Sequence, residues 1–84
     1  MEIIISPAAA KHLAKIDPRD KKKAIRKIDS LLLNPLSGKQ LQGEHSGQRS
    51  LRAWPLRIIY TFESQSQQIE IIDVDYRGGV YKKG

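Results

Sequence analysis

The sequence contains no cysteine, no long apolar segment and comparatively few acidic residues. Without cysteine, neither a disulfide nor a thiolate zinc site can stabilise the fold, and the composition suits a reducing, cytoplasmic compartment. No apolar run approaches the roughly 20 residues that are needed to cross a bilayer. The short apolar run before Ser6 carries an acid at Glu2, so we expect no signal peptide.

The 84 residues predict one small domain spanning 1–84. Lys and Arg number 15 against 9 Asp and Glu, which gives a net charge of +6. Such a basic domain favours a polyanionic partner, which can be nucleic acid, an anionic membrane or an acidic protein. Most lysines precede residue 40 and most arginines follow it. The planar guanidinium of Arg can donate two hydrogen bonds to one phosphate. We therefore interpret the second half of the chain as the part that makes specific contacts with the polyanionic partner.

Residues 49–62 read RSLRAWPLRIIYTF and form the centre of the predicted fold. The segment from Leu56 to Phe62 is rich in β-branched and aromatic residues, which is typical of a strand. Alternation over 49–53 predicts a strand before it. Trp54-Pro55 suits a turn between the two, so the stretch predicts a tight antiparallel hairpin.

Arg57 is unusual because it lies in the middle of an otherwise apolar strand. Burying an unpaired guanidinium is costly, so Arg57 either pairs with a carboxylate or faces a site that binds anions. With Arg49 and Arg52 on the neighbouring strand, it would make an anion-binding sheet face. Solvated arginines on an exposed sheet face are an equally good interpretation of the residues alone.

Two helices are predicted between residues 6 and 34. Ser6-Pro7 and Asp17-Pro18 each combine an N-cap with a proline at the first helical position, and Asn34-Pro35 ends the second helix. Apolar residues at helical spacing predict the buried faces, which are Ala9, Leu13 and Ile16 in the first helix and Ala24, Ile25, Ile28, Leu31 and Leu32 in the second. The other face of the second helix is either solvated or faces a polyanion, and it carries Lys21, Lys22, Lys23, Arg26 and Lys27.

The remaining segments complete the order β-α-α-β-β-β. A short buried strand is predicted at 2–6, a polar loop at 34–47 and a last strand at 68–75. The loop contains Glu44 and His45, a candidate acid–base pair. This order predicts an α+β fold, in which a helical hairpin packs on one face of a twisted sheet and the arginines lie on the open face. His12, on the first helix, is interpreted as a surface residue rather than a ligand.

This order, with Leu56-Arg57-Ile58-Ile59-Tyr60 and Asp75-Tyr76-Arg77-Gly78-Gly79-Val80-Tyr81, resembles the RelE/ParE superfamily of bacterial and archaeal toxins over essentially the whole chain. The resemblance implies a RelE-like, microbial ribonuclease-type fold. For the RelE branch it implies an endoribonuclease that cuts messenger RNA in the ribosomal A site and so inhibits translation. The mRNA 2′-hydroxyl attacks the adjacent phosphate, and no metal or other cofactor is implied. The implied partners are mRNA, the ribosome and a cognate antitoxin, in a toxin–antitoxin hetero-oligomer and not at a membrane.

The same resemblance implies roles for particular residues. Arg57 matches the arginine that contacts the scissile phosphate, Arg77 the one that stabilises transition-state charge, and Tyr81 the tyrosine that handles a proton. From the residues alone, a packing role is the alternative for Tyr81. Arg52 matches a basic position on the preceding strand, and Arg49 lies further along that strand. The exposed lysines of the second helix would attract ribosomal RNA, namely Lys21, Lys22, Lys23 and Lys27.

The sequence departs from the RelE pattern at several positions. Family members carry a lysine pair where this chain has Arg49 and Ser50, and often Gly then His or Lys where it has Asp75 and Tyr76. Asp73 and Asp75 also bring negative charge near the implied site. These departures imply either altered acid–base chemistry or reduced activity. Two alternatives to an mRNA nuclease therefore stay open: a ParE-like inhibitor of DNA gyrase, and a degenerate toxin that only binds its antitoxin.

Overall fold

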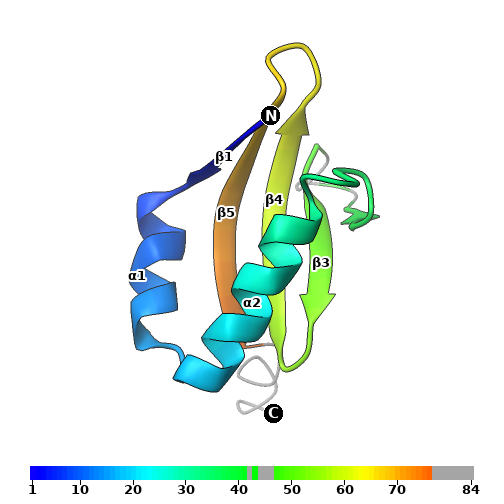
Figure 1. Cartoon of the computed structure of the whole chain (residues 1–84). Coiled ribbons are helices and arrows are strands. Elements are labelled where there is room, and N and C mark those ends of the chain that lie inside the picture. Colours follow the sequence, from blue (N-terminus) through cyan, green and yellow to red (C-terminus); the bar gives the residue numbers. More distant parts are fainter. Residues whose placement is uncertain (42, 44–46, 77–84) are drawn as a thin grey trace.

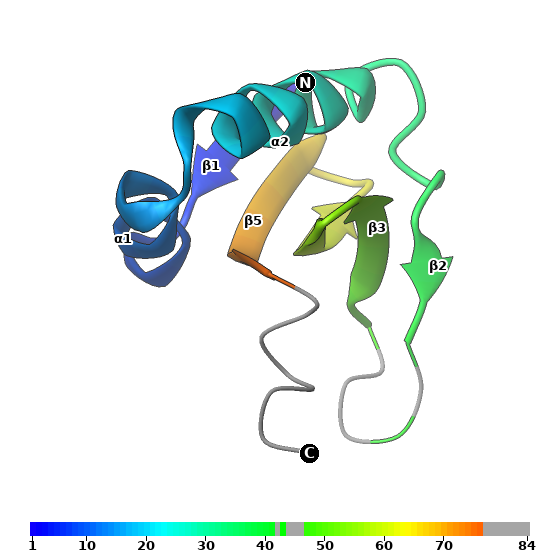
Figure 2. The same cartoon turned by 90° about the horizontal axis from the view of Figure 1, so that it is seen from below.

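The computed structural model describes residues 1–41, 43 and 47–76. In this part of the chain, two helices pack on one side of a five-stranded sheet, which confirms the predicted α+β class (Figures 1 and 2). The helices are α1 (Pro7–Lys15) and α2 (Pro18–Ser30). The strands are β1 (Glu2–Ile5), β2 (Lys39–Gln40), β3 (Arg49–Ala53), β4 (Leu56–Glu63) and β5 (Gln68–Tyr76).

The sheet is mixed and has the strand order β1-β5-β4-β3-β2. β1 runs parallel to β5, and the other neighbouring pairs are antiparallel. β3 and β4 form the hairpin that the sequence predicts, with Trp54 and Pro55 as its turn. The stretch predicted as loop over 34–47 contains the short strand β2, which the sequence did not predict. β4 therefore lies at the centre of the sheet, between β3 and β5.

Both helices begin at the predicted capping residues. Ser6 and Asp17 each accept a hydrogen bond from a backbone N–H in the first turn of the helix that follows. Such a cap satisfies donors that have no partner within the helix and stabilises it by about 1 kcal/mol. α2 ends at Ser30, earlier than the Asn34-Pro35 signal, and the chain continues as a turn over 31–33.

The core lies between the helices and the sheet and includes Tyr60, which is fully buried. The Tyr60 hydroxyl donates to the carbonyl of Pro35 (2.7 Å) and accepts from the N–H of Gly38 (2.9 Å), so it ties the segment after α2 to β4. A Cβ at Gly38 would lie 2.7 Å from the ring and hydroxyl of Tyr60, and only glycine fits there. The buried apolar residues are Ala9, Leu13, Ile16, Ala24, Ile28, Leu31, Leu51, Ala53, Leu56, Ile58, Tyr60, Ile69, Ile71 and Val74.

β1 is not the buried strand that its isoleucines predict. It lies at an edge of the sheet, beside β5. Ile4 and Ile5 are 39% and 44% exposed, and of the three isoleucines only Ile3 packs against the core. The apolar run at 3–5 correctly predicts a strand. It does not predict burial, because the side chains of an edge strand are buried only where another segment packs over them.

The buried stripe of α2 is narrower than predicted. Ala24, Ile28 and Leu31 are buried, whereas Ile25 and Leu32 are 46% and 45% exposed. The buried positions recur at i, i+4 and i+7, which is the spacing of one helix face. Ile25 is turned about 100° from Ala24 around the helix axis and lies beyond that stripe.

A β-bulge divides β5 into two parts. Two consecutive residues of β4 pair with Ile71 and Asp73, so Ile72 has no partner in β4. Alternate residues of a strand point to opposite faces of the sheet. One extra residue therefore turns every side chain that follows it to the face opposite to the one that regular alternation would give. Ile71 and Val74 are therefore both buried under the helices, while Asp73 and Asp75 lie on the opposite face of the sheet. We call that opposite face the open face.

Candidate functional site

Arg57 lies on the open face, in the middle of β4. Its neighbours in the strand, Leu56 and Ile58, are fully buried on the helix side, and alternation turns Arg57 to the other side. Directly across from Arg57 are Arg52 on β3 and Asp75 on β5. The side chain is only partly buried.

Arg57 forms no salt bridge with any residue that the structure describes. Within residues 1–41, 43 and 47–76, the single ion pair joins His12 and Asp73. The residue opposite Arg57 on β3 is a second guanidinium, and like charges in directly opposite positions destabilise a sheet. The described contacts therefore do not support an internal ion pair for Arg57, and they are consistent both with an anion-binding face and with a solvated one.

Two pockets on the open face share Arg57. One has a volume of about 340 Å³ and is lined by Lys39, Leu41, Ser50, Arg52 and Arg57. The other has a volume of about 410 Å³ and is lined by Leu41, Gln48, Arg57, Ile59, Ile72 and Asp73. The first pocket, which we call the cationic pocket, has three cations and no acid among its described lining residues. Such a group of cations attracts an anion, and its guanidiniums can each donate two hydrogen bonds to a phosphate.

Lys39 is a candidate site residue that the sequence did not reveal. It lies on β2, inside the stretch that was predicted as loop, and it pairs with Ser50 of β3. This pairing brings Lys39 into the pocket of Arg52 and Arg57. Lysine is depleted in strands, and a two-residue strand has no periodicity of its own, so no local signal points to this position.

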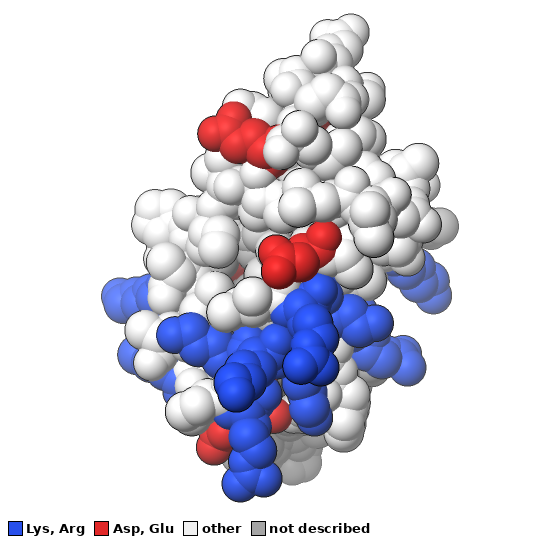
Figure 3. Space-filling model, viewed as in Figure 1, with Lys and Arg blue, Asp and Glu red and all other residues white. Residues whose placement is uncertain are grey.

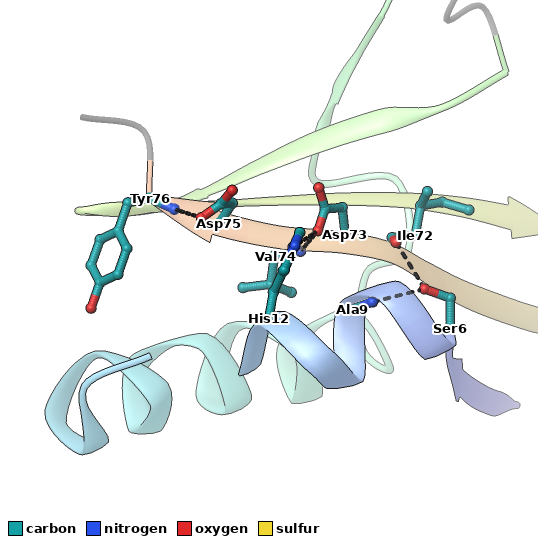
Figure 4. Close-up of polar contacts among 8 residues, drawn as sticks. All are labelled: Ser6, Ala9, His12, Ile72, Asp73, Val74, Asp75 and Tyr76. Atoms are coloured by element: carbon teal, nitrogen blue, oxygen red, sulfur yellow. Dashed lines mark hydrogen bonds and ion pairs between the residues drawn. The ribbon is translucent and has the colours of Figure 1, made fainter. Parts of the chain in front are cut away.

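The two acids near the cationic pocket are engaged with other groups (Figure 4). Oδ1 of Asp73 lies 2.6 Å from Nδ1 of His12 and accepts a hydrogen bond from the N–H of Val74 (2.9 Å). Oδ1 of Asp75 accepts from the N–H of Tyr76 (2.8 Å). His12 is partly exposed, as expected of a surface residue, but it also reaches from α1 to β5. Neither carboxylate forms a salt bridge with an arginine among the described residues.

α1 is fastened to the bulged part of β5 (Figure 4). The hydroxyl of Ser6 donates to the carbonyl of Ile72 (2.8 Å) while it accepts from the N–H of Ala9 (3.1 Å). The N-cap of α1 thus also binds the bulge residue. Together with the contact between His12 and Asp73, this hydrogen bond fixes the part of β5 that lies opposite Ile59, two residues before Asp75, the partner of Arg57.

The structure brings Arg52 and Arg57 together but does not bring Arg49 to them. Arg49 lies three positions before Arg52, and an odd separation places two residues on opposite faces of a strand. Its guanidinium donates to the carbonyls of Gly38 (2.9 Å) and Leu36 (3.4 Å) on the helix side. Three arginines were expected on the open face, but only Arg52 and Arg57 lie there. Arg49 instead holds the segment after α2 against β3.

The lysines of α2 belong to a basic surface on the helix side of the molecule (Figure 3). All four lysines that were predicted to attract RNA are exposed, and they are Lys21, Lys22, Lys23 and Lys27. Beside them, between α2 and the end of β3, lies a groove of about 590 Å³. It is lined by Lys23, Arg26, Lys27, Ser30, Arg52, Ala53 and Trp54.

Tyr76 has a role that the sequence did not reveal. Its hydroxyl donates to Oδ2 of Asp20 (3.0 Å) and accepts from the N–H of Asp17 (3.2 Å), which ties the end of β5 to the start of α2. The hydrogen bond from Asp17 lowers the pKa of Tyr76, but desolvation and the carboxylates of Asp20 and Asp17 outweigh it and raise the pKa above its ordinary value. Tyr76 is therefore a neutral phenol at physiological pH, already engaged with α2.

Four residues singled out in the sequence lie outside the described residues, namely Glu44, His45, Arg77 and Tyr81. Within the described ranges, no three His, Cys, Asp or Glu side chains gather in the way that a metal site requires. The described helices are also too short and too polar to cross a membrane.

Comparison with protein families gives a match over nearly the whole chain. The family model described as ParE toxin of type II toxin-antitoxin system, parDE, matches residues 3–81. None of the curated proteins matches the sequence.

Several solved structures are similar to this one. The toxin–antitoxin complex RelBE2 from Mycobacterium tuberculosis is 27% identical, with a TM-score of 0.84 over 90% of this chain and 96% of that one. The YoeB–YefM complex from Staphylococcus aureus is 25% identical, with a TM-score of 0.72 over 89% and 94%. The archaeal RelE–RelB complex from Pyrococcus horikoshii shares the fold at 20% identity, with a TM-score of 0.78 over 92% and 94%.

Proposed function

The chain belongs to the ParE toxin family of type II toxin–antitoxin systems, within the RelE/ParE superfamily, and on this premise we propose that it is a ribosome-dependent mRNA endoribonuclease. In the proposed reaction, an mRNA 2′-hydroxyl gives up its proton and its oxygen forms a bond to the adjacent phosphorus. The bond to the 5′-oxygen of the next nucleotide breaks, that oxygen takes up a proton, and a 2′,3′-cyclic phosphate remains. Cleavage of mRNA on the ribosome would stop translation.

The observation that carries this proposal is the cationic pocket of Lys39, Arg52 and Arg57. As the 2′-oxygen attacks, negative charge grows on the phosphate oxygens. The sheet fixes the backbone of these three cations beside one another, and electrostatic stabilisation of developing charge is usually the largest single contribution to catalysis. Arg57 is central in this arrangement because it lies in both open-face pockets.

Each residue has a defined part in the proposed reaction. Arg57 holds the scissile phosphate, and Arg52 and Lys39 hold the phosphates beside it. Arg77 stabilises transition-state charge and Tyr81 handles a proton. The last two roles rest on the sequence resemblance, because both residues lie outside the described ranges.

We further propose a cognate antitoxin as the partner of this chain. The similar structures from M. tuberculosis and S. aureus are complexes of a toxin with its antitoxin. The net charge of +6 suits an acidic or amphipathic antitoxin segment, which would associate rapidly through electrostatic attraction. A segment that folds on binding would cover a large surface with a short peptide.

A second candidate function is inhibition of DNA gyrase, because the family model that matches is described as a ParE toxin. Inhibition of gyrase by binding requires no attack on a phosphate. Growth arrest through gyrase would then not require Arg57, Arg77 and Tyr81. Variants at these positions therefore separate the two functions.

Mapping of mRNA 5′ ends by primer extension, in a translation system with and without ribosomes, tests the proposal. We expect new ends only when ribosomes are present. These ends should disappear with Arg57→Ala and persist with Lys15→Gln, a matched loss of one exposed cation on α1. Growth arrest without cleavage, together with inhibition of gyrase supercoiling, would replace the proposal with the second candidate. Antitoxin binding with neither activity would identify a degenerate toxin.

A further inference from the structure

A basic groove with one exposed tryptophan lies between α2 and the turn that joins β3 to β4. Trp54 is 62% exposed and is the only tryptophan in the chain. On this side of the molecule, Lys and Arg side chains gather over the lower part of α2 (Figure 3). The groove has a volume of about 590 Å³.

The groove combines a row of helix cations with the end of a strand. Lys23, Arg26 and Lys27 follow the spacing i, i+3 and i+4, which places them on neighbouring positions of one helix surface. Arg52 contributes a fourth cation from β3, two positions before Trp54 in the chain. All four cations are exposed. Among the described residues that line the groove, none is acidic, so these charges attract an external anion.

The chemistry of this groove fits an unpaired nucleic-acid strand better than a peptide helix. Single-stranded nucleic acids are bound by cations that follow the backbone and by aromatic rings on which bases stack. An amphipathic peptide helix instead requires a groove with several apolar anchor sites at helical spacing. Here the only apolar residues among the described lining are Ala53 and Trp54.

We propose that this groove binds single-stranded RNA, with one base stacked on Trp54 and neighbouring phosphates on Lys23, Arg26, Lys27 and Arg52. The choice of RNA rests on the proposed function, but the groove is a second pocket, which shares only Arg52 with the cationic pocket that would hold the scissile phosphate. Arg52 lines both the groove and the cationic pocket. A strand in the groove can therefore continue past Arg52 towards Arg57.

The fluorescence of Trp54 reports directly on the proposed stacking, because the chain has no other tryptophan. The probe is a mixed-sequence 2′-O-methyl oligoribonucleotide, which has no free 2′-hydroxyl and cannot be cleaved. We expect saturable quenching by the single strand and little quenching by the same strand in a duplex, whose bases are already stacked. Equal quenching by the duplex, or binding of the single strand without quenching, would overturn the proposal.

Variants at the groove separate stacking from charge, with binding measured by fluorescence anisotropy of the labelled probe. Trp54→Ala should weaken binding about tenfold, whereas Trp54→Phe, which keeps an aromatic face, should retain most of it. Arg26→Gln with Lys27→Gln should reduce the slope of log K against log salt by about 1.4. The control pair is Lys11→Gln with Lys15→Gln, an equal loss of charge on α1, on the other side of α2 from β3 (Figure 1). Equal effects of both pairs would show that only net charge matters and would overturn the proposal.

Two further results separate RNA binding in the groove from binding of a protein partner and from the proposed cleavage. A glutamate-rich amphipathic peptide that quenches Trp54 at lower concentration than the RNA would overturn the proposal in favour of a protein partner. The probe requires neither a ribosome nor cleavage, so a failure of the proposed mRNA cleavage would leave the quenching result intact. Ribosome-dependent cleavage by a protein whose Trp54 shows no quenching would overturn the groove proposal alone.

Discussion

Arg52 on β3 and Arg57 on β4 are directly opposite each other, so two guanidinium groups lie side by side on the open face. Opposite like charges destabilise a sheet, by an amount on the order of 0.5 kcal/mol. No carboxylate among the described residues forms a salt bridge with either side chain. Fold stability does not explain this pair, whereas an anion bound between the two strands would.

Replacing Arg57 with alanine is expected to abolish growth arrest without lowering the melting temperature. Cleavage should fall by about 10²–10³-fold, the usual effect of removing one preorganised group that stabilises a transition state. Arg57→Ala removes the repulsion from Arg52 together with the attraction to Asp75, which lies opposite on β5, so the two losses should offset and the melting temperature should stay close to that of the wild type. Cleavage assays on purified ribosomes and thermal denaturation measure the two effects. Normal arrest by a folded Arg57→Ala variant would remove Arg57 from the site, and unfolding of that variant would support a structural ion pair.

Asp73→Asn should strengthen binding to the ribosome about threefold. Asp73 shares a pocket with Arg57, and removing one negative charge several ångströms from a phosphate site gains about 0.6 kcal/mol in a water-like dielectric. The asparagine oxygen can still accept a hydrogen bond from His12, so the contact between α1 and β5 should persist. Binding at fixed salt, compared with Glu63→Gln at the far end of β4, measures the effect. Unchanged or weaker binding would show that Asp73 does not weaken the site.

Changing Lys21, Lys22, Lys23 and Lys27 together to glutamine should weaken ribosome binding and flatten its salt dependence. Each cation that neutralises a phosphate contributes about 0.7 to the slope of log K against log salt, so the slope should fall by about 3. Binding measured over a series of salt concentrations gives this slope. Identical curves for the wild type and the variant would mean that this helix face is merely solvated.

Gly38→Ala should destabilise the fold by about 1–3 kcal/mol, because the new Cβ would overlap the ring and hydroxyl of Tyr60. For a domain of this size, each kcal/mol lowers the melting temperature by about 4–8 °C. Combining Gly38→Ala with Tyr60→Phe removes one of the two overlapping atoms. The free energies of unfolding of the single and double variants should therefore not add. A melting temperature equal to that of the wild type would contradict the close packing of Gly38 on Tyr60.

Much of the fold can be predicted from the sequence because its signals are local. Ser6-Pro7 and Asp17-Pro18 fix the starts of both helices through hydrogen bonds within a few residues. Trp54-Pro55 marks the turn of the central hairpin because proline lacks the N–H that a central strand requires, which is also a local signal. The same local argument places Arg57 in the middle of a strand and identifies it as a residue that requires an explanation.

The parts that could not be predicted depend on contacts between distant segments. Lys39 enters the cationic pocket only because β2 pairs with β3. The engagement of Asp73 by His12 joins residues that lie far apart in the sequence. The position of Arg49 is a different case, because its odd separation from Arg52 already places it on the other face.

The bulge at Ile72 has a consequence for how β5 tolerates a change of length. Ile69, Ile71 and Val74 face the core, so deletion of Ile72 would leave a regular alternation in which every remaining side chain keeps its present face. Such a deletion would remove the carbonyl that Ser6 binds and the extra twist that a bulge gives a strand. Ile72 therefore behaves as an inserted residue that changes the shape of β5 and not its burial pattern. The core and the curvature of the strand beside Arg57 can thus be altered separately.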